Sequence, residues 1–203
     1  YVRQIGNIQT ETFCKKHLKN SPIFCPDKIK EEQMLDLLSS CKKEGDSIGG
    51  VVECRIKNCP VGLGEPVYEK LEANFAKAML SIPAVKGFEI GSGFSSCVKK
   101  GSENNDCFNT EDERIIFSSN HAGGTLGGIS TGQEIVFKVA FKPTSSIGKS
   151  QPTIDIFGQK KEYVLPEGSR HDQCISIKGT VVVEAMAYLV LADSYLLNKI
   201  ARV

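Results

Sequence analysis

The feature that most constrains this chain is a glycine-rich run that leads directly into a strand-like segment. Asn120–Gly132 contains five glycines in thirteen residues. In the following segment, Gln133–Phe141, every second residue from Ile135 to Phe141 is large and apolar. That two-residue period predicts a strand with one apolar face. Glycines at such a turn either supply positive φ or let the backbone approach a ligand, and the spacing does not favour either reading.

The predicted strand ends at a short polar run made of Lys142, Pro143, Thr144, Ser145 and Ser146. Proline has no backbone N–H, so the chain leaves the sheet here with an ammonium and three hydroxyls. These groups suit a phosphate, although the same run is also an ordinary strand exit. Because no Gly-Lys-Ser/Thr follows the glycines, and no Gly-x-Gly-x-x-Gly stands between a strand and a helix, P-loop and dinucleotide-binding readings are disfavoured.

The composition indicates an ordinary globular chain. Its 203 residues are 40% hydrophobic, and 25 Lys and Arg nearly balance 24 Asp and Glu, for a net charge of +1. A chain of this length can bury a sizeable core. The balance gives no reason to expect nucleic acid or an anionic membrane as a partner, so we predict neither.

The eight cysteines do not stand at metal-binding spacings. There is no Cys-x-x-Cys, and none of the three histidines stands at a zinc-ligand spacing from a cysteine pair. We predict no metal site and free thiols in a reducing compartment, hence a cytoplasmic protein. A secreted, disulfide-linked interaction protein is the alternative that the cysteine count alone leaves open.

Helical periodicity predicts three helices. One follows Asp27, which can cap it, and a second begins at Pro66 with Val67 as the first residue of its apolar stripe. The third, Val181–Leu197, is expected to be a buried helix and not a membrane span, because Glu184 and Asp193 interrupt it. The carboxyl group of Glu184 is expected to be buried and satisfied by a partner.

Two further segments have distinct patterns. In Val51–Asn58, apolar residues alternate with Glu53, Arg55 and Lys57, which predicts a half-buried strand with a charged outer face. The stretch 95–113 is polar and is expected to be a mobile surface loop.

Arg170-His171-Asp172 brings together an anion clamp, a group that titrates near neutrality and a carboxylate. Such a cluster can carry proton transfer. More often an isolated cluster of this kind is a solvated corner, so the tripeptide alone does not establish catalysis.

Seven separate blocks together resemble the chorismate synthase family, in the same order and spacing across nearly the whole chain. The blocks are Gly49–Glu53, Gly62–Val67, Ser81–Gly87, Asn120–Gly124, Gly127–Ser130, Lys142–Ser146, and Arg170–Asp172 continuing to Glu184-Ala185. Seven blocks in register are far more specific than any one of them.

The resemblance implies an α+β fold, a sandwich of helices between antiparallel sheets, assembled as a tetramer. It implies a lyase of the shikimate pathway, in aromatic amino acid biosynthesis, which converts 5-enolpyruvylshikimate 3-phosphate to chorismate and phosphate. In that family reduced FMN is required although no net oxidation occurs, because the flavin lends electron density transiently as phosphate leaves. NADPH would take part only if the protein reduces its own flavin.

The resemblance also assigns site residues, one position at a time. Asp172 matches the family's acid/base aspartate, and His171 is expected to orient or pack beside it. His121 lies in a matching block and is given no proton-transfer role. The positions that fall where the family contacts FMN are Pro83, Ala84, Gly127, Lys142, Pro143, Thr144, Ser145, Ser146 and Arg170.

The chain departs from the family pattern in two ways. Gln173 stands where the family usually has proline. The family's Gly-x-Ser-His-Gly and Arg-Ser-Ser-Ala-Arg motifs, which belong to its amino-terminal part, have no counterpart here. We therefore interpret residues 1–203 as a carboxy-terminal portion of such an enzyme, truncated and inactive by itself. The alternative is a non-catalytic module that binds FMN or phosphate.

Overall fold

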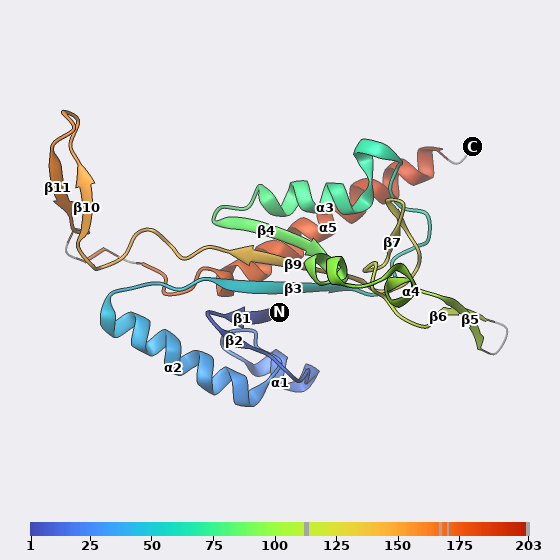
Figure 1. Cartoon of the computed structure of the whole chain (residues 1–203), viewed down its shortest axis with the longest axis horizontal. Coiled ribbons are helices and arrows are strands. Elements are labelled where there is room, and N and C mark those ends of the chain that lie inside the picture. The colour runs from blue at the N-terminus through green and yellow to red at the C-terminus, as the bar shows by residue number, and fades with distance from the viewer. Residues whose placement is uncertain (112–113, 167, 170, 202–203) are drawn as a thin grey trace. The chain divides into compact units, whose positions relative to one another are not determined.

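A computed structural model describes residues 1–111, 114–166, 168–169 and 171–201 (Figure 1). The chain divides into two compact units. Unit 1 comprises Tyr1–Val52 and Ala140–Thr180, and unit 2 comprises Glu53–Val139 and Val181–Val203.

Five strands form the main sheet, with hydrogen-bonded neighbours in the order β2-β1-β3-β9-β4 (Figure 1). Their bounds are β1 Val2–Ile5, β2 Ile8–Gln9, β3 Gly50–Ile56, β4 Val85–Ile90 and β9 Ile135–Phe141. β1 is antiparallel to both β2 and β3. β3 and β9 each contribute residues to both units.

Helix α2 (Lys28–Glu44) belongs to unit 1 and confirms the first predicted helix. The Asp27 carboxylate accepts hydrogen bonds from the backbone N–H groups of Ile29 and Lys30, both at 3.1 Å, so it caps the helix as expected. Gly45 ends the helix in the left-handed conformation. The short helix α1 (Lys15–Asn20) precedes it. The core of this unit consists of Val2, Ile5, Ile23, Cys25, Met34 and Cys174.

Strand β9 confirms the alternation predicted from the sequence. Ile135, Phe137, Val139 and Phe141 are all buried, and the residues between them are half-buried. In unit 2 the ring of Phe137 packs against those of Phe75 and Phe88, with centroids 5.1 and 5.4 Å apart. Phe75 belongs to helix α3 (Leu71–Leu80), whose Leu71, Phe75 and Met79 are fully buried.

The prediction that Val67 begins the α3 stripe is wrong. Val67 is 68% exposed, has a φ of +67°, and lies in the separate 3-10 turn η1 (Val67–Glu69). Lys70, with an extended ψ of 139°, separates that turn from the helix. The stripe therefore starts one turn later than its spacing suggests.

The predicted charged outer face of β3 is also wrong at Glu53. Its side chain is 4% exposed, and the Arg55 Nε donates to its carboxylate at 2.7 Å. A buried carboxylate is tolerated when a cation and a hydrogen bond compensate it.

The polar stretch around 95–113 contains short regular elements. These are η2 (Gly93–Val98), α4 (Gly101–Asn104) and β5 (Phe108–Glu111), which pairs with β6 (Arg114–Phe117). The side chain of Asp106, between α4 and β5, is only 2% exposed. That the stretch moves in solution stays a prediction.

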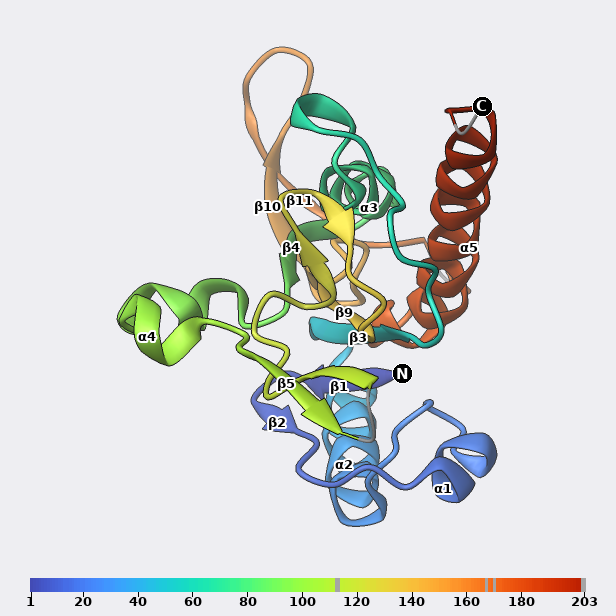
Figure 2. The ribbon, with the colours of Figure 1, turned by 90° about the vertical axis from the view of Figure 1, so that its right-hand side faces the viewer.

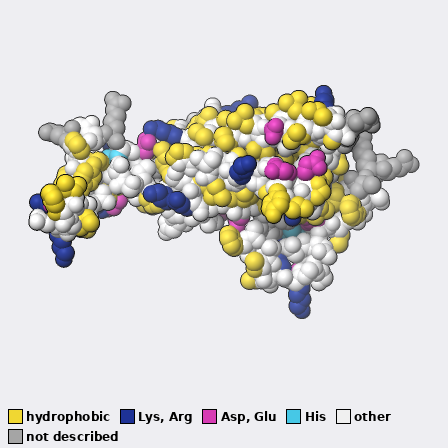
Figure 3. All heavy atoms as spheres, turned by 90° about the horizontal axis from the view of Figure 1, so that it is seen from above, with side chains coloured by type: hydrophobic (Ala, Val, Ile, Leu, Met, Phe, Trp, Pro, Cys, Tyr) yellow, Lys and Arg dark blue, Asp and Glu magenta, His cyan; other side chains and the backbone are white. Residues whose placement is uncertain are grey.

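Two elements expose unusual apolar surface. Helix α5 (Ser176–Ala201) was expected to be buried, but only 17% of its most apolar 18-residue window is buried, so that prediction is wrong. Glu184 is exposed as well, so it is not the satisfied buried carboxylate that we expected. By length and composition α5 could cross a membrane, a property that core helices of soluble proteins share. Figure 3 shows hydrophobic side chains gathered over the region of α3 and α5.

The second element is a hairpin of unit 1, formed by β10 (Gln151–Ile154) and β11 (Lys160–Tyr163). All of its strand residues except Gln151 are exposed.

Candidate functional site

The polar run after β9, Lys142–Ser146, lies in unit 1, and a hydrogen bond anchors its central residue, Thr144. The Ser47 hydroxyl donates to the Thr144 carbonyl oxygen at 2.7 Å. Lys142, Ser145 and Ser146 are exposed, and among the described residues their ammonium and hydroxyl groups make no hydrogen bond. The run therefore presents one cation and two hydroxyls to solvent from an anchored backbone.

A side-chain hydrogen bond joins this run to the Arg-His-Asp segment. The Thr144 hydroxyl donates to the Asp172 carbonyl oxygen at 3.0 Å, across 28 residues of sequence. The Ile48 N–H donates to the carbonyl of the next residue, Gln173, at 2.7 Å. The Lys142–Ser146 run and the Arg-His-Asp segment, which the sequence analysis proposed separately, are thus in direct contact. The Thr144 hydroxyl already donates its proton to the Asp172 carbonyl oxygen. Anion binding is therefore expected mainly from Lys142, Ser145 and Ser146.

The Asp172 carboxylate has a partner that the sequence reading missed. Lys178 Nζ donates to Asp172 Oδ1 at 2.6 Å, and the two side chains are 70% and 37% exposed. Lys178 lies in the first turn of α5. Its only sequence signal is a lysine six residues after the aspartate, at the start of a helix.

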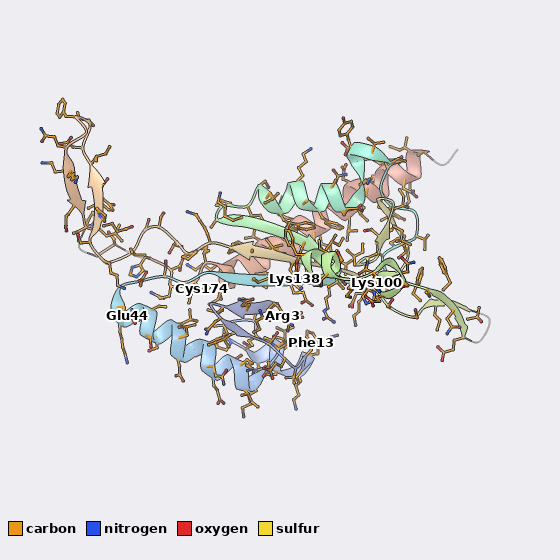
Figure 4. All side chains as sticks on the ribbon, viewed as in Figure 1. Arg3, Phe13, Glu44, Lys100, Lys138 and Cys174 are labelled. Atoms are coloured by element: carbon orange, nitrogen blue, oxygen red, sulfur yellow. The ribbon has the colours of Figure 1, made fainter. Side chains whose placement is uncertain are left out.

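The neighbours of Asp172 in sequence are less fully defined. Arg170 lies outside the described residues. His171 is half-buried, and its Nε2 is a buried atom without a hydrogen-bond partner among the described residues. Figure 4 labels Cys174, two residues after Asp172, on the same segment.

Pro83 and Ala84 form the turn between α3 and β4 in unit 2. Ala84 has a φ of +68°. A left-handed conformation costs an alanine about 1–2 kcal/mol and is often found at functional positions. Phe24, Asn58 and Val67 share this conformation, so the functional role of the turn stays a prediction.

Gly127 is the open position of the glycine run. It lies in the tight turn between β7 (Thr125–Leu126) and β8 (Ile129–Ser130), with a φ of +59°, and a Cβ added there would meet no atom within 4 Å. Gly123 is different, because a Cβ there would collide with the backbone of Gly91. The run therefore serves close backbone packing at Gly123 and leaves free space at Gly127.

Gly127 and Pro83 are not brought together within unit 2. The Leu71 N–H at the start of α3 donates to the Gly128 carbonyl at 2.8 Å, whereas Pro83 follows the carboxyl end of the same helix. A ten-residue helix is about 15 Å long. These two predicted FMN contacts thus lie near opposite ends of α3.

Asp106 anchors the glycine run from the preceding segment. Its carboxylate accepts hydrogen bonds from the Ser119 hydroxyl at 2.6 Å and from the backbone N–H groups of His121 and Ala122 at 2.7 and 2.9 Å. Burial alone would raise the pKa of the Asp106 carboxyl, but these hydrogen bonds hold that pKa below its ordinary value. The sequence reading did not single out this residue.

A cavity of about 500 Å³ in unit 2 contains none of the predicted site residues. It is lined by Val61, Ile116, Phe117, Asn120, Thr131, Gly132, Gln133 and Glu134. It lies beside the start of β9, whereas Lys142 follows the end of that strand. Three of its lining residues, Asn120, Thr131 and Gly132, belong to the glycine run that also contains Gly127.

Within the described residues, no cluster of three His, Cys, Asp or Glu side chains could hold a metal ion. All eight cysteines are described, and each is a free thiol. Burial raises the pKa of the half-buried Cys54 thiol to about 11, which disfavours the reactive thiolate.

Comparison with known proteins gives the family. The family model of chorismate synthase matches residues 1–196. The chain belongs to the chorismate synthase family. It is 50% identical over 209 residues to the chorismate synthase of Protochlamydia amoebophila (strain UWE25), covering 98% of this chain and 57% of that protein. It is 48% identical over 182 residues to that of Opitutus terrae (strain DSM 11246 / JCM 15787 / PB90-1), covering 90% and 50%.

A solved structure agrees with the sequence relatives. A crystal structure of chorismate synthase superposes with a TM-score of 0.78 at 28% identity, covering 98% of this chain and 56% of that one. The expected α+β fold of chorismate synthase type is therefore confirmed. The chain spans about half the length of the chorismate synthases that it matches.

The residues present fit the flavin that the family resemblance implies. A flavin mononucleotide carries a phosphate, and Lys142, Ser145 and Ser146 offer for one a cation and two hydroxyls that have no partner within the described part of the chain. Gly127, a separate predicted contact in unit 2, has open space beside its backbone.

Proposed function

We propose that, in a protein of its relatives' full length, this chain supplies the flavin side of a chorismate synthase active site. The reaction would eliminate phosphate from 5-enolpyruvylshikimate 3-phosphate to give chorismate. The observation that carries the proposal is the hydrogen bond from the Thr144 hydroxyl to the Asp172 backbone carbonyl, because it joins the candidate phosphate-binding run to the main chain of the candidate acid/base residue. Family membership supports the same reaction.

Each part of the site has a distinct task in this proposal. Lys142, Ser145 and Ser146 would hold the FMN phosphate, and Asp172 would accept or return a proton. The remaining FMN contacts would come from Pro83, Ala84, Pro143, Thr144, Gly127 and Arg170. Bound reduced FMN would supply the transient electron density that helps the substrate phosphate to leave.

The assembly and compartment belong to the proposal as well. We propose a homotetramer in the cytoplasm, supported by family membership and, for the compartment, by the eight free thiols. NADPH would be a second cofactor only if the full-length protein reduces its own flavin.

The test is turnover of 5-enolpyruvylshikimate 3-phosphate by the full-length protein with reduced FMN, followed as chorismate absorbance. Asp172→Asn removes a general acid/base and should lower kcat roughly 100- to 10,000-fold, with FMN affinity unchanged. Asp36→Asn is the matched control, since Asp36 is exposed on α2. Unchanged kcat in Asp172→Asn would remove Asp172 from the mechanism.

The same assay separates the enzyme from the alternative of a binding module. Residues 1–203 alone should bind FMN weakly or not at all and show no turnover. Tight FMN binding by residues 1–203, together with a full-length protein that lacks turnover, would favour the binding module.

A further inference from the structure

We propose that Lys178 is a positioning residue for Asp172, a role that rests on the proposed function. Lys178 Nζ binds Asp172 Oδ1 at 2.6 Å, whereas Oδ2 makes no hydrogen bond among the described residues. One oxygen is therefore fixed by a cation, and no described residue competes for the other.

The backbone around Asp172 is already fixed, so only its side-chain torsions need a further partner. The Thr144 hydroxyl holds the Asp172 carbonyl at 3.0 Å, and the Ile48 N–H holds the Gln173 carbonyl at 2.7 Å. With the main chain held at two consecutive residues, the ion pair to Lys178 determines where the carboxylate points. Asp172 is thus restrained through both its backbone and its side chain.

The position of Lys178 runs against local helix preference. It lies in the first turn of α5, and that first turn contains no acidic residue. A cation at this end is opposed by the helix dipole, which favours negative charge there. Residues that break a local rule are expected at functional sites. The Asp172 carboxylate, just before the helix, compensates the misplaced charge.

Fold stability does not explain the pair. Both side chains are partly exposed, and exposed ion pairs contribute little to stability. Among the described residues, Lys178 is the one cation paired with Asp172. A role in orienting the carboxylate is therefore the better account of this contact.

The experiment uses the full-length protein with reduced FMN and compares Lys178→Met with Lys178→Arg. Loss of orientation should lower kcat of Lys178→Met about 10- to 100-fold. Its KM for substrate and its Kd for FMN should stay within about twofold, because the lost contact acts on the chemical step. Lys178→Arg keeps the charge and should restore most of kcat. Lys199→Met, at the other end of α5, is the matched control.

A double-mutant cycle separates positioning from a structural role. If Lys178 acts only through Asp172, adding Lys178→Met to Asp172→Asn should cost nothing further. The inference would be overturned if the kcat losses of the two single variants multiply in the double variant, or if Lys178→Met has a normal kcat. Either result would leave the proposed function intact. A wild-type protein without turnover would overturn the proposed function and this inference with it.

Discussion

At the scale of single residues, Asp106 shows how one carboxylate can organise a glycine-rich turn. Its oxygens receive a hydroxyl and two backbone N–H groups from Ser119, His121 and Ala122. His121 Nδ1 lies 3.6 Å from the same carboxylate and 3.1 Å from the Asn104 carbonyl. The polar segment before the turn thereby fixes the turn's backbone.

Asp106→Asn should destabilise unit 2 by about 1–3 kcal/mol at pH 7, because part-buried backbone N–H groups lose a charged acceptor. The folded-state pKa of Asp106 is lowered, so its contribution is present above the unfolded-state pKa and is lost as pH falls through the folded one. The wild-type and variant curves should therefore converge in acid, below about pH 4. Urea unfolding from pH 7 to pH 3 measures this, with Asp36→Asn as control. A constant difference at every pH would contradict the assignment.

At the scale of elements, the glycine run divides into packed and open positions. The β7–β8 turn and the contact between Gly123 and Gly91 form within unit 2. A spacing pattern shows only that glycines recur, whereas the neighbours that a Cβ would meet show what each glycine does.

Gly123→Ala and Gly127→Ala make a matched pair, since both positions have positive φ, at +73° and +59°. Gly127→Ala should cost about 1–2 kcal/mol, the penalty of the left-handed conformation alone. Gly123→Ala should cost about 1–3 kcal/mol more, because its Cβ meets the backbone of Gly91. Thermal or urea unfolding gives both values, and equal losses would refute the distinction.

At the scale of the whole molecule, α5 exposes a series of large apolar side chains. Its exposed hydrophobic residues are Val181, Val182, Tyr188, Leu189, Tyr195, Leu196, Leu197 and Ile200. Exposed patches of this kind mark interaction surfaces or aggregation liabilities. Figure 2 shows the length of the helix on which they lie.

Residues 1–203 alone should therefore self-associate and elute above their 22.1 kDa mass at micromolar concentration. Leu189→Glu combined with Leu196→Glu should shift the chain toward monomer without changing its helix content. Light scattering and circular dichroism measure the two effects. Ile156→Glu, on the exposed β10–β11 hairpin, is the control. If it acts equally well, the association is not specific to α5.

The sequence by itself determined those elements whose signals are local. The Asp27 cap of α2 and the alternation of β9 follow from side-chain chemistry over a few residues. The seven blocks of family resemblance nominated both segments that meet at Thr144 and Asp172. The roles of the individual residues in the site stay predictions.

Only the tertiary structure decided what depends on distant neighbours. The role of Gly123 depends on Gly91, which lies in another segment of the chain, and the exposure of α5 depends on what covers it. The ion pair between Lys178 and Asp172 was found only in the structure, because the turn before α5 brings the two side chains together. Periodicity shows that a face is apolar or charged, but burial is a property of the contacts that the folded chain makes, and these join residues far apart in sequence.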